Sequence, residues 1–106
     1  MTQLFPKPIL DLPEADIPIK GIKAFLSQGL DHQIIFMEFS EDAEIFEHFH
    51  ESQWGIVLEG KIDLKIDGVK NTFFKGDRYF IPKDIKHSAK VYAGYRRAFC
   101  CTRRQF

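Results

Sequence analysis

The segment K-I-D-L-K-I-D-G, residues 61–68, places the strongest constraint on the fold. Apolar and charged residues alternate in it without a break. Because successive side chains of a strand point to opposite faces, this alternation predicts a strand with one face in the core and the other in water. Asp-Gly at 67–68 is a preferred pair for a two-residue hairpin turn, so residues 69–74 are expected to return antiparallel beside it.

Similar short segments recur along the rest of the chain and end at Gly or polar clusters. Strands are predicted within residues 21–29, 32–39, 45–50, 53–59, 78–82, 87–92 and 95–106. The segment 32–39 is apolar on both faces, so both faces must be covered. About nine short strands with frequent turns are typical of an all-β barrel or sandwich.

The first 20 residues differ from the rest, because they hold four of the five prolines. Proline lacks the backbone donor that a sheet needs, so residues 1–20 are predicted to form an irregular arm. Residues 21–106 are then predicted to form one barrel, since 106 residues suit a single domain.

Charge and composition exclude several classes of partner. Lys plus Arg and Asp plus Glu number 15 each, so no overall field favours nucleic acid or an anionic membrane. No segment has the length of a membrane span or the pattern of a secretion signal, and we expect a cytoplasmic protein. The adjacent Cys100 and Cys101 are expected to be reduced, packed thiols.

Three histidines form the candidate site. His48 and His50 are one residue apart, so they would project from the same face of a strand. His87 follows a turn after the short strand that Gly76 and Pro82 delimit. Neutral imidazole binds divalent first-row metals well, so this triple predicts a metal site. His32 has no partner at ligand spacing and is expected to be an ordinary surface residue.

These segments resemble the paired motifs of the cupin superfamily, in particular its small single-domain conserved-barrel (cupin 2) members. Six positions match the motif spacing: His48, His50, Gly60, Gly76, Pro82 and His87. The chain departs from the motifs at Asp42, Gln53, Asp84 and Val91, and the gap between His50 and Gln53 is short. The resemblance implies a jelly-roll (double-stranded β-helix) barrel holding Fe, Mn, Ni or Zn through His48, His50, Gln53 and His87.

Gln53 stands where the family has an acidic ligand. A neutral amide leaves the charge of a divalent metal uncompensated, so the site should attract an anion. Some similar cupins with Gln at this position act on uronates derived from pectin. The alternative is that Gln53 points away from the metal.

Two functions follow from the resemblance. The first is a metal-dependent enzyme of the dioxygenase, isomerase or lyase type that acts on a small, oxygen-rich, anionic molecule. The sequence does not identify the residue that would act as its general acid or base. The second is a non-catalytic small-molecule-binding or sensor barrel.

The arginines near the C-terminus (Arg96, Arg97, Arg103 and Arg104) occupy alternate faces and are expected to form a solvated edge. The apolar segment 32–39 and the arm favour a homodimer.

Overall fold

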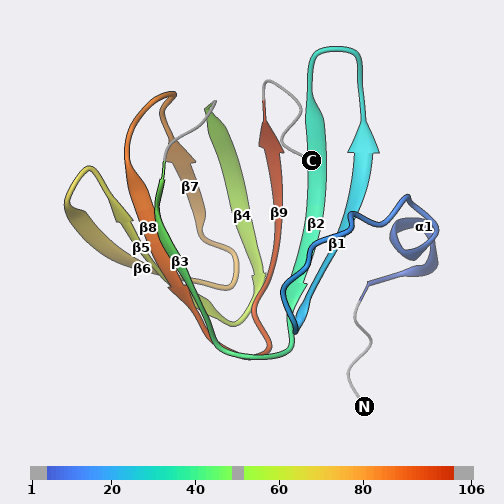
Figure 1. Cartoon of the computed structure of the whole chain (residues 1–106), viewed down its shortest axis with the longest axis horizontal. Helices are drawn as coiled ribbons and strands as arrows, with labels where there is room; N and C mark the ends of the chain where they lie inside the picture. The colour runs from blue at the N-terminus through green and yellow to red at the C-terminus, as the bar shows by residue number, and fades with distance from the viewer. Residues whose placement is uncertain (1–4, 49–51, 102–106) are drawn as a thin grey trace.

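The computed structural model describes residues 5–48 and 52–101, with Glu47, His48 and Cys101 described by their backbone alone. This part of the chain contains one helix and nine strands (Figure 1). The helix is α1 (Lys7–Leu10), and the strands are β1 (Ile22–Gln28), β2 (Gln33–Phe39), β3 (Ala43–His48), β4 (Gln53–Glu59), β5 (Lys61–Ile66), β6 (Val69–Phe74), β7 (Arg78–Ile81), β8 (His87–Val91) and β9 (Arg96–Cys101).

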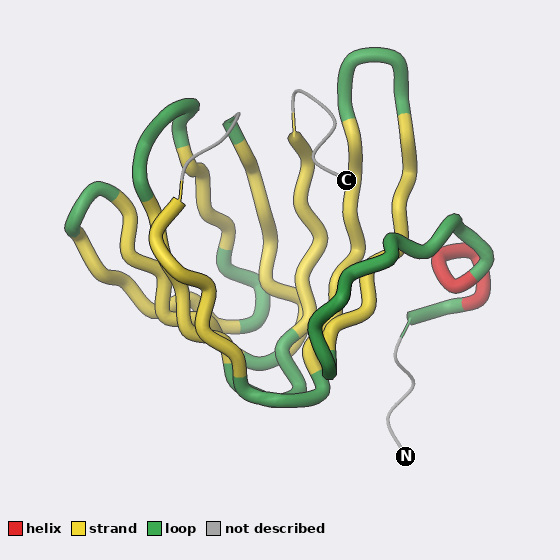
Figure 2. Tube along the Cα trace, in the orientation of Figure 1, coloured by secondary structure: helices red, strands yellow, loops and turns green. Residues whose placement is uncertain are grey.

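The strands form two antiparallel sheets that face each other (Figures 1 and 2). The larger sheet has the order β1-β2-β9-β4-β7 and the smaller has the order β3-β8-β5-β6. Neighbours in both sheets come from distant parts of the sequence, as in β2-β9 and β3-β8. The prediction of an all-β jelly roll is therefore confirmed.

The hairpin β5-β6 has the geometry that the alternating segment predicts. Ile62 and Leu64 are buried, whereas Lys61 and Lys65 are exposed. The turn between the strands has φ values of 49° at Asp67 and 81° at Gly68. Positive φ at both turn positions matches the right-handed twist of the flanking strands, which is why Asp-Gly suits this connection.

The core lies between the sheets and consists of the inward-facing residues of alternating strands. In β2, every second residue (Ile35, Met37 and Phe39) is at most 4% exposed. In β4, the same face carries Gln53, Gly55 and Val57. One face of the larger sheet thus supplies core side chains and also Gln53, a residue of the candidate site.

The N-terminal arm packs on the outer face of β1 and β2. Phe5 is 4% exposed, and its ring meets the rings of Phe25 and Phe36 edge-on, at centroid distances of 6.0 and 6.1 Å. Glu14 forms an isolated bridge with Phe25. The arm therefore covers the second apolar face of β2 from within the same chain.

The helix α1 is a local feature that the proline pattern did not predict. It begins after Pro6 and has Pro8 in its first turn, where the missing N–H has no helical partner to lose. Within the described residues, no helix combines the length and the apolar character that crossing a membrane requires.

One end of the sandwich collects the ends of strands from both sheets. Gln53, the first residue of β4, pairs with Ile81 at the end of β7 and with Cys101 at the end of β9. In the smaller sheet the Cα partner of His48 is His87. We call this end, uppermost in Figure 1, the mouth.

Candidate metal and ligand site

A cavity of about 330 Å³ lies between the two sheets. Its wall is mostly aliphatic and aromatic, and two residues of the arm, Ile17 and Ile19, contribute to it. The polar side chains that line it are Gln53, His87 and Arg97. An apolar cavity of this size with a few convergent polar groups is the usual form of a small-molecule site.

Two of the four predicted metal ligands are described with their side chains, and both lie at the mouth end of this cavity. Gln53 is 4% exposed and His87 is 4% exposed. They come from different sheets, since β4 belongs to the larger sheet and β8 to the smaller. Gln53 and His87 line the same cavity, and whether the Gln53 amide faces a metal there stays a prediction.

The backbone brings His48 to the same place. His48 is the cross-strand Cα partner of His87, after a shift in the β3-β8 register between Ile45 and His48. His50 lies outside the described residues. Among the side chains that the structure describes, no three His, Cys, Asp or Glu residues form a metal-binding group. The metal set His48, His50, Gln53 and His87 therefore stays a prediction.

The imidazole of His87 is held in one tautomer. Its Nδ1 lies 3.1 Å from the carbonyl oxygen of Ile85. A carbonyl only accepts hydrogen bonds, so Nδ1 donates and the ring's lone pair is on Nε2. Histidine ligands of metals commonly donate their other ring nitrogen in this way, which fixes the ring and raises its basicity. His87 thus has the tautomer that a metal ligand requires, and the metal itself stays a prediction.

The third polar residue of the cavity corrects the sequence analysis. Arg97 was expected at a solvated edge but is only 9% exposed. Its neighbours on the same face of β9, Tyr95 and Phe99, are 0% and 2% exposed. The apolar Tyr95 and Phe99 at alternating positions were the signal that Arg97 points inward. Arg96 points to the other face, where its Nε lies 3.9 Å from Glu38.

Gly55 explains how Arg97 is held. A Cβ at Gly55 would lie 2.4 Å from Cζ of Tyr79, so the phenol ring occupies the space that glycine leaves on β4. The ring crosses β4 from β7 and reaches β9, where Nη1 of Arg97 donates a hydrogen bond of 3.2 Å to the Tyr79 hydroxyl. Nη2 of Arg97 contacts the sulfur of Met37 at 3.5 Å.

The guanidinium keeps its charge in this setting. Burial alone lowers the pKa of Arg97, but the neighbouring Tyr79 and Tyr95 hydroxyls raise it above its ordinary value. Burial also raises the pKa of Tyr95 far above that of an exposed phenol. The hydroxyls of Tyr79 and Tyr95 therefore lie beside a buried cation.

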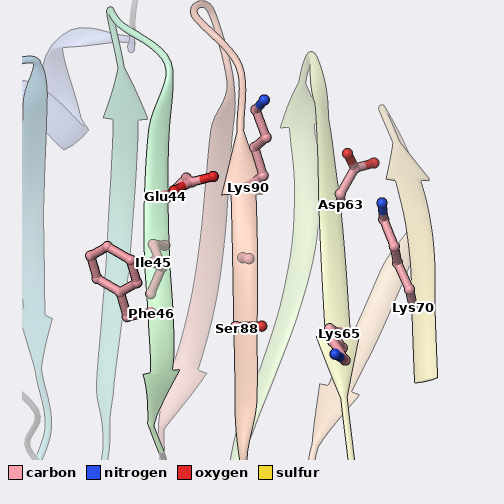
Figure 3. A pocket seen from close by; sticks show the side chains of 9 residues that line it. Glu44, Ile45, Phe46, Asp63, Lys65, Lys70, Ser88 and Lys90 are labelled. Atoms are coloured by element: carbon pink, nitrogen blue, oxygen red, sulfur yellow. The ribbon is translucent and has the colours of Figure 1, made fainter. Parts of the chain in front are cut away.

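A second, larger hollow of about 620 Å³ lies on the outer face of the smaller sheet (Figure 3). Its charged residues, both acidic and basic, are Glu44, Asp63, Lys65, Lys70 and Lys90. Phe46 lines it and is 79% exposed. We call this feature the outer hollow. Its lysines lie with carboxylates on an open sheet face, so it lacks the enclosure of the cavity.

A match to a protein-family model identifies the family of this chain. A cupin domain model matches residues 35–92, which is just over half of the 106 residues. The chain belongs to the cupin domain family. None of the curated proteins searched matches this cupin.

Solved structures share the fold of this cupin. An RmlC-like cupin from Shewanella frigidimarina has a TM-score of 0.80 and 24% identity, over 91% of this chain and 87% of that one. KdgF from a Halomonas species has a TM-score of 0.77 and 21% identity, over 99% and 97%. An oxalate decarboxylase variant from Bacillus subtilis has a TM-score of 0.77 and 17% identity, over 92% of this chain but 29% of that one. Another structure of that decarboxylase is described as having Mn(II) centres.

Two departures from the cupin motifs keep the local backbone in place. Asp84, at a motif glycine, has a φ of 62°. Asp is one of the few residues besides Gly that tolerates the left-handed region, so the turn before His87 is preserved. Asp42, at the glycine that opens the first motif, accepts a hydrogen bond of 2.8 Å from the backbone N–H of Ala93.

Proposed function

We propose that this cupin is a metal-dependent enzyme of the dioxygenase, isomerase or lyase type that acts on a small, oxygen-rich anion, such as a uronate. The observation that carries the proposal is the cavity itself. It joins a histidine with a fixed tautomer and a buried amide at the mouth to a buried guanidinium further inside. These groups line one cavity whose volume is large enough for a small molecule.

The mouth suits a divalent transition metal. His87 presents Nε2 and Gln53 presents an amide, and His48 and His50 are the further ligands that the motif predicts. A bound Fe, Mn, Ni or Zn ion would polarise an oxygen of the substrate as a Lewis acid. With Gln53 in place of an acid, the described ligands bring no negative charge, which favours an anionic substrate.

The remaining cavity residues bind and orient the substrate. Met37, Phe39 and Phe99 supply an apolar wall that excludes water from the interior. The Tyr79 hydroxyl fixes the position of Arg97, so positive charge stands deep in the cavity. Charge in such a site acts more strongly than in water.

The test begins with protein purified without a histidine tag. We expect metal analysis by mass spectrometry to find a bound transition metal, and a panel of uronates, β-diketones and thiols to include a substrate. His48→Ala should lose both metal and turnover. His32→Ala is the matched control, because His32 is exposed and outside the cavity, and it should retain both.

The panel also separates the two functions. Binding of a ligand without its conversion would refute the enzyme and establish the non-catalytic binding barrel. If the protein carries no transition metal and takes none up when it is added, the metal site is refuted both for the enzyme and for the binding barrel.

We also propose that the chain forms a homodimer. Phe5 covers part of the β1-β2 face, where the contact was expected. The same sheet continues into an apolar pair of cross-strand neighbours, Trp54 and Phe80, which are 46% and 56% exposed. A second copy would bury them. Sedimentation as a monomer at micromolar concentration would contradict the dimer.

A further inference from the structure

Arg97 carries a charge that no residue described by the structure neutralises. No carboxylate among these residues pairs with it, and its polar contacts are the Tyr79 hydroxyl and the Met37 sulfur, with the Tyr95 hydroxyl nearby. Nε of Arg97 is buried and has no hydrogen-bond partner there. A buried, unpaired charge is costly, since water solvates ions far better than a protein interior does. Such a group is expected where a ligand supplies the missing acceptor.

The unused donors form one edge of the guanidinium. Nη1 is engaged with the Tyr79 hydroxyl. Nε–H and an Nη2–H lie parallel on the other edge, and Nη2 meets only the Met37 sulfur, which is a weak acceptor. Two parallel N–H donors match the two oxygens of a carboxylate.

The guanidinium leans toward the mouth. Its Cζ lies 4.5 Å from the ring centroid of Phe99 and 6.0 Å from that of Tyr95, and Phe99 is nearer to the mouth along β9. The register places Arg97 beside Val57 and places Gln53 at the start of β4. Four residues of strand, about 13 Å, separate these two positions.

We propose that Arg97 binds the carboxylate of the substrate at the inner end of the cavity, while a separate oxygen of the same molecule faces the mouth. The substrate class is therefore a hydroxy or oxo monocarboxylic acid whose second oxygen function is several bonds from the carboxylate. This inference rests on the proposed function for the role of the mouth, but carboxylate binding at Arg97 requires no metal.

The experiment compares two probes of nearly equal shape, 5-oxohexanoate and 5-oxohexanamide. Their dissociation constants are measured by NMR titration of chelator-treated protein and of protein loaded with Zn²⁺. We expect the carboxylate to bind roughly ten- to hundredfold more tightly in both forms, as a charge-assisted pair predicts. The ¹⁵N resonance of Arg97 Nε should shift with the carboxylate and stay in place with the amide.

Variants test whether Arg97 causes the preference for the carboxylate probe. Arg97→Gln should abolish it, and Arg97→Lys should retain part of it, because lysine keeps the charge but lacks the fork. Arg78→Gln is the matched control, since Arg78 is exposed on β7 next to Tyr79, and it should keep the full preference. If Arg97→Gln does not fold, the Nε resonance and the comparison of probes in the wild type decide alone.

Equal binding of the two probes, no binding of either, or a preference that survives in folded Arg97→Gln would overturn the inference. These results are separate from the test of the proposed function. A carboxylate preference in the chelator-treated protein without any turnover supports the Arg97 site and refutes the enzyme. Turnover of a uronate without any carboxylate preference supports the enzyme and refutes the Arg97 site.

Discussion

The cavity and the outer hollow differ in where they place their charged side chains. The outer hollow is the larger, about 620 Å³ against about 330 Å³. Its Lys65, Lys70 and Lys90 are exposed, so water screens them at little cost in stability. The cavity holds a single cation, Arg97, among aromatic rings. Charge that a fold keeps in its interior despite the cost indicates a site more strongly than charge at its surface.

The largest expected difference between the two regions concerns packing. Phe39 lines the cavity and is 2% exposed, whereas Phe46 borders the outer hollow and is 79% exposed. We expect Phe39→Ala to lower the free energy of unfolding by about 3–5 kcal/mol, and Phe46→Ala to change it by about 0.5 kcal/mol or less. Urea denaturation of both variants measures this. Similar losses would mean that Phe46 is buried against a partner in solution.

The second prediction concerns the support of Arg97. Gly55→Ala places a methyl group 2.5 Å from the Tyr79 hydroxyl oxygen, so the ring must move away from Arg97. We expect a loss of about 1–3 kcal/mol in unfolding free energy from overpacking, together with weaker carboxylate binding. In a double-mutant cycle, Gly55→Ala should lower the free energy of unfolding by less in the Tyr79→Ala background than in the wild type. An unchanged cost in that background would exclude Tyr79 as the cause.

The third prediction uses two aspartates with the same unusual backbone. Asp84 has a φ of 62° and precedes His87, and Asp67 has a φ of 49° in the β5-β6 turn. A β-branched residue is strained there, so Asp84→Val and Asp67→Val should each cost about 1–2 kcal/mol. Calorimetry with Zn²⁺ should show weaker binding for Asp84→Val alone. Equal effects on metal binding would mean that the turn does not position His87.

The smallest effect belongs to the outer face. Hydrogen bonds to Asp63 from Tyr92, at 2.6 Å, and from Thr72, at 2.7 Å, lower the pKa of this carboxyl below its ordinary 3.8. Because the folded pKa is the lower one, the stabilisation is present above pH ~4 and is lost as the pH falls through the folded pKa. Denaturation at pH 7 and pH 3 should show that the wild type loses a few tenths of a kcal/mol more than Asp63→Asn. Tyr92→Phe should reduce the pH dependence in the same direction.

Much of the fold was predictable because its patterns are local. Alternation defined β5, Asp-Gly defined the hairpin, and the motif spacing brought His87 and Gln53 to one cavity. Arg97 was missed because its assignment depends on long-range pairing. The apolar Tyr95 and Phe99 are a local signal for its face, but the register of β9 with Met37 and Val57 is what places that face in the interior. The space at Gly55 that admits Tyr79 also depends on strands that meet only in the fold.

We propose that the mouth of the cavity binds a metal through His87. Calorimetric titration of Zn²⁺ into tag-free, chelator-treated protein tests this proposal. We predict one ion per chain for the wild type, the same affinity for His32→Ala, and an affinity at least roughly a hundredfold lower for His87→Ala, because a direct ligand is lost. Equal affinity in all three proteins, or no binding to the wild type, would contradict the account.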